Sequence, residues 1–183
     1  MGELWVVRHG ETAWSLAGRH TGRTDVPLTE HGEEQARELS LRLDRPWRLV
    51  LSSPLQRATR TAALAGLTAE VDRDLAEWAY GPAEGLTTAE LSAEAQWSVW
   101  DDVALGETVD QVGERAGRVI ARVEPLLADG DVCLVAHGHL LRVLAAVWLG
   151  QPPRDGRLWV LGPARIGVLG HEHAQKVLQS WNA

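Results

Sequence analysis

Short apolar runs that stop abruptly at polar residues recur along the chain. Three of them cover residues 4–7, 49–51 and 132–136, and each leads directly into charged, hydroxyl or imidazole side chains. Runs of this length, bounded by turn residues, are typical of fully buried strands in a parallel sheet. Two later runs, residues 158–161 and 166–169, predict further strands.

Helical spacing fills the intervals between these runs. After Thr29, apolar residues recur at the spacing of one helix face. Ser53 is expected to cap a second helix, with Pro54 at its first position and Gln56 completing a capping box. Gly66 is expected to end that helix, since glycine is the usual residue just after a helix.

Later helices carry clear start signals. Thr87 with Glu90, and Thr108 with Gln111, have the spacing of capping boxes. Residues 140–149 are apolar almost all round, which predicts a buried helix. Strands that alternate with helices predict an α/β fold, here a three-layer α/β/α sandwich with a mainly parallel central sheet.

The length of 183 residues predicts one domain over residues 1–183. Residues 78–107 are the least patterned stretch, and we interpret them as a short excursion over the site. A net charge of −7 argues against nucleic acid or an anionic membrane as a partner. The single cysteine excludes a disulfide within the chain, and neither a signal peptide nor a membrane span is evident. We therefore expect a cytoplasmic protein.

Four side chains that can bind phosphate or attack phosphorus follow the apolar runs. Arg8 and His9 end the first run, Arg57 lies early in the helix after the second, and His137 ends the third. Ligands of such sheets bind beyond the carboxyl ends of the strands, where these residues would converge. Two guanidinium groups and a helix N-terminus suit a phosphate. An imidazole among arginines is disfavoured as a cation, so it can attack phosphorus without a metal.

Five motifs in chain order carry a resemblance to a known family. They are residues 4–12 (Leu-Trp-Val-Val-Arg-His-Gly-Glu-Thr), 27–36 (Pro-Leu-Thr, then Gly32 and Gln-Ala), 52–62 (Ser-Ser-Pro-Leu-Gln-Arg-Ala, then Thr-Ala), 75–85 (Leu-Ala-Glu, then Gly81 and Glu-Gly) and 135–138 (Val-Ala-His-Gly). Together they resemble the histidine phosphatase superfamily, in its phosphoglycerate-mutase-like branch. The local resemblance is closest to small bacterial acid phosphatases that are often labelled as mutases.

The resemblance implies a role for each matched residue. His9 would attack phosphorus in line and become phosphohistidine. Arg8, Arg57 and His137 would hold the non-bridging oxygens and stabilise the transition state. Glu77 would protonate the leaving alcohol and later deprotonate water, and burial or neighbouring carboxylates would keep it partly protonated for that role. No cofactor and no metal is implied.

The resemblance also implies further positions that bind or orient without taking part in the reaction. Thr21 and Gly22 match a loop that contacts phosphate, and Ser15 stands in the substrate-binding region where mutase relatives usually have Asn. Glu11 would orient a neighbour. His139 would either face the pocket mouth or have a structural role at a helix start.

Structural interpretations compete with these assignments. A histidine at a strand end is often only a hydrogen-bonded structural residue, and Arg57 could face solvent as we expect of Arg60. The position of the acid also has rivals close to Glu77. These are Glu70, Asp72, Asp74 and Glu84.

Departures from the mutase pattern favour a phosphatase that hydrolyses small phosphorylated metabolites. Residues 78–106 contain no Lys, Arg or His, whereas a mutase must retain a doubly anionic intermediate. The alternative, a phosphoglycerate mutase, would need cations from elsewhere, such as Arg19 or Arg23. A short excursion also implies an open site with a loose preference for the leaving group.

Two other function classes remain as alternatives. A metal-dependent hydrolase is suggested by His137-x-His139 and His171-x-His173, although the latter pair is expected in an exposed end segment. A catalytically idle phosphate-binding module is the other. Exposed tryptophans would provide a surface for a homodimer, and Trp97 and Trp100 in the excursion have no assigned role.

Overall fold

A six-stranded sheet forms the centre of the computed structural model, which describes residues 1–92, 98–101 and 106–183. The strand order is β3-β2-β4-β1-β5-β6. The first four of these are parallel, and the last two are antiparallel to their neighbours. The prediction of a mainly parallel sheet is confirmed. The strands are β1 (Leu4–Arg8), β2 (Leu49–Ser52), β3 (Glu70–Val71), β4 (Val132–Ala136), β5 (Ile166–Glu172) and β6 (Gln175–Ser180).

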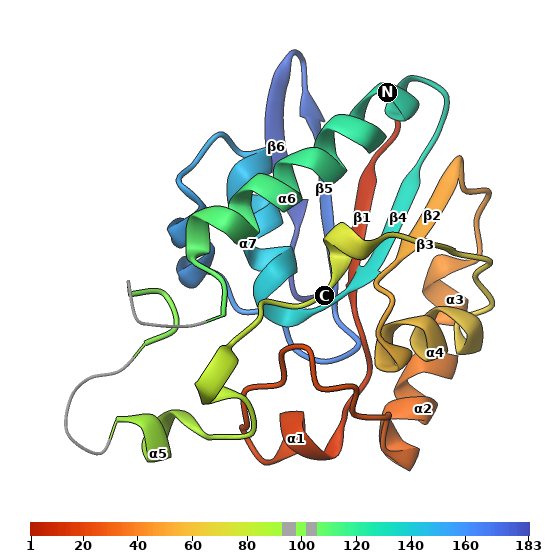
Figure 1. The fold of residues 1–183 in the computed structure, drawn as a ribbon. Coiled ribbons are helices and arrows are strands. Elements are labelled where there is room, and N and C mark those ends of the chain that lie inside the picture. Colours follow the sequence, from red (N-terminus) through yellow and green to blue (C-terminus); the bar gives the residue numbers. More distant parts are fainter. Residues whose placement is uncertain (93–97, 102–105) are drawn as a thin grey trace.

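Helices cover both faces of the sheet (Figure 1). Alternate strand residues pack into two separate cores, as period-two side chains require. Val6 packs with α6 and α7, whereas Val7 on the other face packs with the helices after β1 and β2. The architecture is thus a three-layer α/β/α arrangement. The covering helices are α2 (Glu30–Glu38), α3 (Ser40–Leu43) and α4 (Gln56–Leu64) on one face, and α6 (Val109–Val123) and α7 (Gly138–Trp148) on the other.

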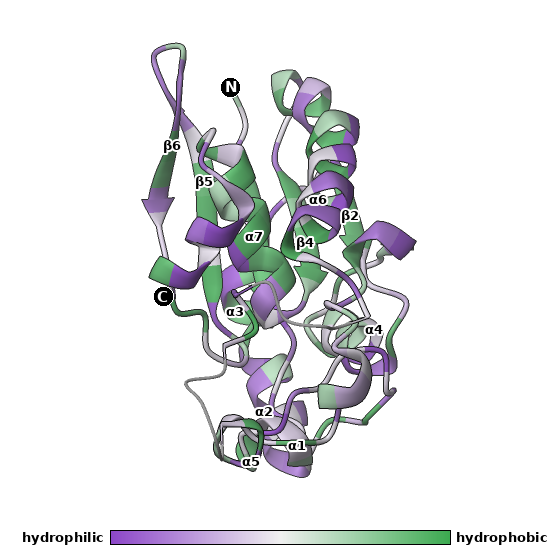
Figure 2. Cartoon of the chain, turned by 60° about the vertical axis from the view of Figure 1, so that its left-hand side comes forward, coloured by the Kyte–Doolittle hydropathy of each residue, from purple (hydrophilic) through white to green (hydrophobic). Residues whose placement is uncertain are grey.

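Helix α7 is the most apolar of the covering helices. Figure 2 shows it coloured mainly as hydrophobic, like the strands that it lies against, whereas α6 alternates hydrophobic and hydrophilic residues. This confirms the buried helix predicted from its pattern, and the capping boxes at Thr87 and Thr108 are also present. No helix in the described part of the chain is long and apolar enough to cross a membrane.

Short helices complete the connections between the larger elements. They are α1 (Ala13–Leu16), α5 (Thr88–Leu91) and the 3-10 helices η1 (Arg73–Leu75), η2 (Gly81–Ala83), η3 (Glu124–Ala128) and η4 (Pro153–Leu158). Helices α1 and α5 lie beyond the carboxyl edge of the parallel strands (Figure 1). They therefore stand on the side of the sheet where ligands are expected.

The predicted start of α4 was wrong. The helix begins at Gln56 and its N-cap, Leu55, makes no side-chain hydrogen bond. The Gln56 N–H instead donates to the Asp25 carboxylate over 2.8 Å. The Ser53 hydroxyl lies 2.7 Å from Nε2 of His137, the residue after β4. It therefore contacts this histidine and forms no capping box with Gln56.

The C-terminal region also differs from its prediction. Residues 158–161 form no strand, because their carbonyls meet side chains rather than a neighbouring strand: Val160 accepts from Trp181 and Leu161 accepts from Arg8. Strands β3 and β6 were not predicted. The segment 171–173 is not a chain end but runs from β5 into the turn of the β5–β6 hairpin.

Tryptophans do not form the exposed surface expected for a homodimer. Each tryptophan in the described ranges is buried or half-buried. Trp97 lies outside the described residues. Trp100 is buried, and its ring packs edge-on against Trp78 with centroids 5.5 Å apart.

Candidate active site

The carboxyl ends of β1, β2 and β4 bring the predicted strand-end residues together. In the parallel ladder of β1 and β4, Arg8 is in register with Ala136. The next residue on each strand is a histidine, His9 after β1 and His137 after β4. The His9 N–H donates to the Ala136 carbonyl over 3.0 Å. The ring centroids of His9 and His137 consequently lie 5.1 Å apart, although the residues are far apart in sequence.

One nitrogen of His9 is fixed by the backbone. Nδ1 lies 2.7 Å from the Gly10 carbonyl oxygen. A carbonyl only accepts hydrogen bonds, so Nδ1 carries the proton and Nε2 holds the free lone pair. Burial, and then the positive charges of Arg57 and Arg8, hold the pKa of His9 well below its usual value. His9 is therefore a neutral imidazole with an available nitrogen.

His137 is the neutral partner of a buried guanidinium. Arg57 Nε donates to His137 Nδ1 over 3.2 Å, which leaves Nε2 to donate to the Ser53 hydroxyl. Burial first, and then Arg57, lower the pKa of His137 far below its ordinary value. Arg57 itself is fully buried, so the solvent-facing interpretation of this arginine is excluded.

The remaining donors of Arg57 hold the loop after α1. Its two Nη atoms donate to the carbonyls of Thr21, Gly22 and Thr24 over 2.8–3.2 Å. Gly22 is packed so closely that a Cβ there would lie 2.3 Å from Glu84 Oε1. Thr21 lines the cavity described below. Gly22 does not line it and contacts Arg57 through its carbonyl oxygen.

One hydrogen-bond donor of Arg8 is unpaired among the described residues. Its Nη1 donates to the Leu161 carbonyl over 2.6 Å, but its buried Nε has no partner among the described residues. A Cβ on Gly138 would lie 3.2 Å from the guanidinium carbon, so the glycine leaves room for this side chain. An unpaired donor on a half-buried cation is suited to an anion.

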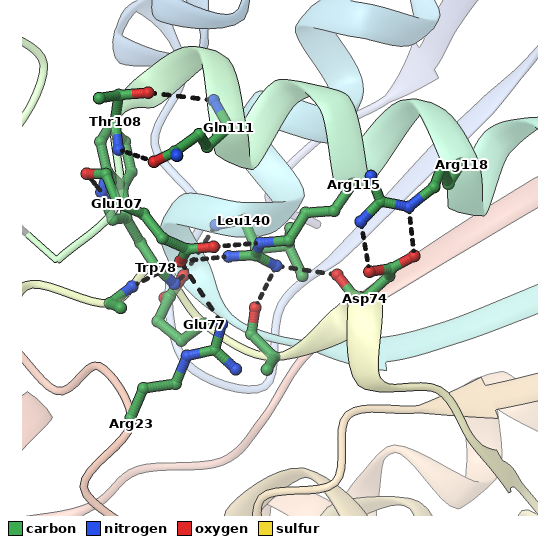
Figure 3. Close-up of polar contacts among 12 residues, drawn as sticks. Arg23, Asp74, Glu77, Trp78, Glu107, Thr108, Gln111, Arg115, Arg118 and Leu140 are labelled. Atoms are coloured by element: carbon green, nitrogen blue, oxygen red, sulfur yellow. Dashed lines mark hydrogen bonds and ion pairs between the residues drawn. The ribbon is translucent and has the colours of Figure 1, made fainter.

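Glu77 lies on the opposite side, at the N-terminus of α7. Its carboxylate accepts hydrogen bonds from the backbone N–H groups of Trp78, His139 and Leu140 over 2.9–3.1 Å. The side chain is 5% exposed, so the expected burial is present. Its contacts are N–H donors rather than the neighbouring carboxylates that were expected. Figure 3 shows Glu77 with Trp78 and Leu140.

The rival carboxylates are engaged elsewhere. Asp72 and Glu70 pair with Arg122, and Asp74 pairs with Arg118 on the outer side of α6. Of the acidic residues considered, Glu77 is the one that lines the cavity.

A cavity of about 230 Å³ opens over these groups. Arg8, His9 and Glu77 form part of its wall, while Arg57 and His137 lie behind His9. Ser15 also lines it, but the serine hydroxyl is held by the backbone of Thr12 in the α1 capping box. The other lining residues are Gly18, Arg19, His20, Thr21, Tyr80, Gly138, His139, Arg142, Val160 and Leu161.

Sequence reasoning missed Tyr80 and Arg142. The Tyr80 hydroxyl hydrogen-bonds to His139 Nδ1, which places His139 in the wall of the cavity as well as at the start of α7. Arg142 lies one turn after Gly138, donates to the Gly156 carbonyl over 2.9 Å and stacks on Trp100. The spacing of four residues from Gly138 was the signal that could have found Arg142.

The two arginines considered as extra cations differ in position. Arg19 lines the cavity mouth and its Nη1 contacts both the Gly85 carbonyl and Glu90. Arg23 instead reaches Glu107 over 3.5 Å, outside the cavity lining (Figure 3).

The histidine pairs proposed as zinc ligands do not converge. His137 contacts Arg57 and Ser53, whereas His139 contacts Tyr80. Within the described ranges, no group of three or more His, Cys, Asp or Glu residues is arranged to hold a metal ion. The zinc-dependent alternative therefore has no ligand set there.

Comparisons with known proteins agree on one family. The model of the histidine phosphatase superfamily (branch 1) matches residues 4–183. An acid phosphatase of Mycobacterium tuberculosis is 44% identical over 184 residues, which cover 96% of this chain and 89% of that protein.

Solved structures agree with this match. An open reading frame of Mycobacterium tuberculosis, 40% identical, superposes with a TM-score of 0.93 over 99% of this chain and 97% of the other. A mycobacterial glucosyl-3-phosphoglycerate phosphatase, 32% identical, superposes with a TM-score of 0.85 over 100% of this chain and 99% of the other.

Three neutral imidazoles, two buried and one half-buried, make stability depend on pH. His9, His137 and His139 have a pKa well below 6.5 in the folded chain, chiefly through burial. Below pH 6.5 the unfolded chain binds protons that the folded chain does not, so the free energy of unfolding falls as pH falls. Each imidazole contributes about 1.4 kcal/mol per pH unit in this range. Urea unfolding at about pH 7.5 and about pH 5.5 measures the difference.

The variant His139→Gln tests the attribution of this pH dependence. Its free energy of unfolding should change less between the two pH values than that of the unmodified chain, by about one imidazole's contribution. Equal slopes in both proteins would contradict the assignment.

Proposed function

Because the chain belongs to the histidine phosphatase superfamily (branch 1) and is a phosphatase, we propose that His9 is its nucleophile toward small phosphomonoesters. The observation that carries this proposal is the hydrogen bond from His9 Nδ1 to the Gly10 carbonyl. It leaves Nε2 unprotonated in a cavity wall that also contains Arg8 and Glu77. The reaction needs no metal in this mechanism.

The first step transfers the phosphoryl group to the protein. His9 Nε2 forms a bond to phosphorus as the bond from phosphorus to the alcohol oxygen breaks. Glu77 gives its proton to that oxygen, so a neutral alcohol leaves. Arg8, in the cavity wall, stabilises the charge on the non-bridging oxygens, as guanidinium groups do in phosphoryl transfer. Arg57 adds its positive charge from behind His9, where it donates to His137.

The second step returns the protein to its starting state. A water molecule attacks phosphorus, the bond to His9 Nε2 breaks, and Glu77 takes the proton from the water. Inorganic phosphate leaves. Two placements support this sequence. Glu77 lies in the loop after η1 and is bound by backbone N–H groups of α7, whereas His9 directly follows β1. The acid and the nucleophile thus face the same cavity from different elements.

Hydrolysis is favoured over the mutase reaction by the charge of the excursion. Its residues 78–106 carry no Lys, Arg or His. A mutase has to hold a second anionic group until phosphate returns. Besides Arg8, the described arginines that line the cavity are Arg19, which is paired with Glu90, and Arg142. The phosphatases among the relatives support small phosphorylated metabolites as substrates. Ser15 and Thr21 line the cavity that would hold these substrates.

Other expectations from the sequence stay proposals. We propose that residues 1–183 form one domain with residues 78–107 as its excursion, supported by the use of segments from both ends in one sheet. A cytoplasmic location stays an expectation from the sequence, and a homodimer one from the resemblance. Sedimentation of the purified protein measures the oligomeric state.

Replacement of His9 tests the covalent step. The unmodified chain should hydrolyse p-nitrophenyl phosphate in the presence of a chelator, and acid-labile phosphohistidine should be trapped after rapid quenching. His9→Ala should lose at least about 10³-fold in kcat and form no phosphoenzyme, because the nucleophile is absent. His173→Ala, exposed on the β5–β6 turn, is the matched control. Activity that the chelator abolishes, or that His9→Ala retains, would contradict the mechanism.

Replacement of Glu77 tests the proton donor. Glu77→Gln keeps the shape of the side chain but has no proton to give. It should lower kcat about 10²-fold to 10⁴-fold for aliphatic phosphates, whose alcohols leave only when protonated. The loss should be much smaller for p-nitrophenyl phosphate, because p-nitrophenolate leaves without a proton. Equal losses on both substrates would show that Glu77 is not the acid.

A further inference from the structure

A buried arginine outside the cavity contacts the chain beside Glu77. Arg115, on α6, is 4% exposed. Its Nη1 donates to the carbonyls of Ala76 and Asp74 over 2.5 Å and 2.8 Å. Ala76 is the residue directly before Glu77, so the guanidinium fixes the backbone on the N-terminal side of Glu77.

The counterion of Arg115 holds the other side. Arg115 donates from Nε and Nη2 to the two carboxylate oxygens of Glu107 over 3.0 Å and 3.2 Å. Glu107 Oε2 also accepts from the N–H of Ala79 over 2.8 Å, two residues after Glu77. The Glu107 backbone adds bonds to the Trp78 indole and the Ala79 carbonyl. Figure 3 shows Arg115 and Glu107 side by side next to Glu77.

This arrangement is more specific than packing requires. A buried ion pair gains little stability over apolar residues of the same volume, since both charges lose their hydration. The donors of Arg115 are directed to carbonyls and a carboxylate that fix residues 74–79. Glu77 in turn must stay within hydrogen-bond reach of a leaving oxygen, and a displacement of about 1 Å can cost 10²-fold in rate.

We infer that Arg115, through its ion pair with Glu107, is a positioning residue for the general acid Glu77. The inference rests on the proposed function, in which Glu77 protonates the leaving alcohol. Arg115 is not among the residues that line the cavity, so it would not contact a substrate bound there. Its removal should therefore impair the step that uses the Glu77 proton, while the phosphate site of Arg8 and His9 stays in place.

Arg118 provides a matched control on the same helix. Its guanidinium forms two hydrogen bonds with the Asp74 carboxylate, over 2.7 Å and 2.9 Å, and its side chain is 60% exposed. It thus touches the same segment as Arg115 through an exposed side chain rather than through the backbone beside Glu77. Exposed pairs of this kind contribute little to stability.

The experiment measures kcat and KM for phosphomonoesters whose leaving groups range from p-nitrophenol to aliphatic alcohols. Arg115→Met should lower kcat on the order of 10²-fold for aliphatic phosphates, with little change in KM. Its loss on p-nitrophenyl phosphate should be below about tenfold. Arg115→Lys should recover part of the activity, because it restores one donor. Arg118→Met should change neither substrate by more than about twofold.

A double variant separates positioning from general destabilisation. In the Glu77→Gln background, Arg115→Met should cause little further loss on aliphatic phosphates, because the two residues act on one proton transfer. Additive losses, or equal losses of Arg115→Met on all substrates, would overturn the inference. If Arg115→Met fails to fold, Arg115→Met with Glu107→Leu replaces the whole pair by apolar residues and keeps the test open.

The same series distinguishes the two proposals. If Glu77→Gln shows no dependence on the leaving group, the assignment of the acid fails, and the inference about Arg115 fails with it. If Glu77→Gln shows this dependence but neither Arg115 variant does, the acid assignment stands and the positioning role of Arg115 is refuted.

Discussion

The proposed chemistry of this protein depends on two guanidinium groups held next to neutral imidazoles at the carboxyl edge of a parallel sheet. Arg57 is fully buried and donates directly to His137, and the charges of Arg57 and Arg8 oppose protonation of His9. Among the described residues, Glu77 is the only carboxylate in the cavity wall. The centre therefore carries excess positive charge, and the buried Nε of Arg8 has no hydrogen-bond partner in the described part of the chain. A phosphate dianion would satisfy that donor and balance that charge.

The edge of the sheet and the loop that carries Glu77 meet at the cavity, and each forms one side of it. The sheet sets the phosphate side, because the parallel register of β1 and β4 fixes where both imidazoles stand. The acid side comes from a loop rather than a strand. That loop is held by the N-terminus of α7, which binds the Glu77 carboxylate, and by the ion pair of Arg115, within α6, with Glu107, just before α6. Loops lack a hydrogen-bonded ladder of their own, so such anchors are needed to keep a proton donor in place.

The sequence predicted that His9, Arg57 and His137 would lie together, but it did not predict the residues that anchor the loop of Glu77. Buried runs ending in polar residues located β1, β2 and β4, because a buried parallel strand has to be continuously apolar. The start of α4 was mispredicted because Asp25, distant in sequence, supplies the acceptor expected from Ser53. Strand β3 has two exposed residues and no hydrophobic period. Arg115 and Tyr80 were missed because their partners lie far along the chain, and long-range hydrogen bonds leave no periodic signal.

The central claim is that phosphate passes through a covalent bond to His9. The stereochemical course at phosphorus tests it most directly, using a phosphorothioate monoester made chiral with oxygen isotopes and hydrolysed in isotopically labelled water. Each in-line displacement inverts the configuration, so transfer first to His9 and then to water predicts net retention. Net inversion would mean that water attacks the ester directly. It would contradict the account, however closely His9, Arg8 and Glu77 surround the cavity.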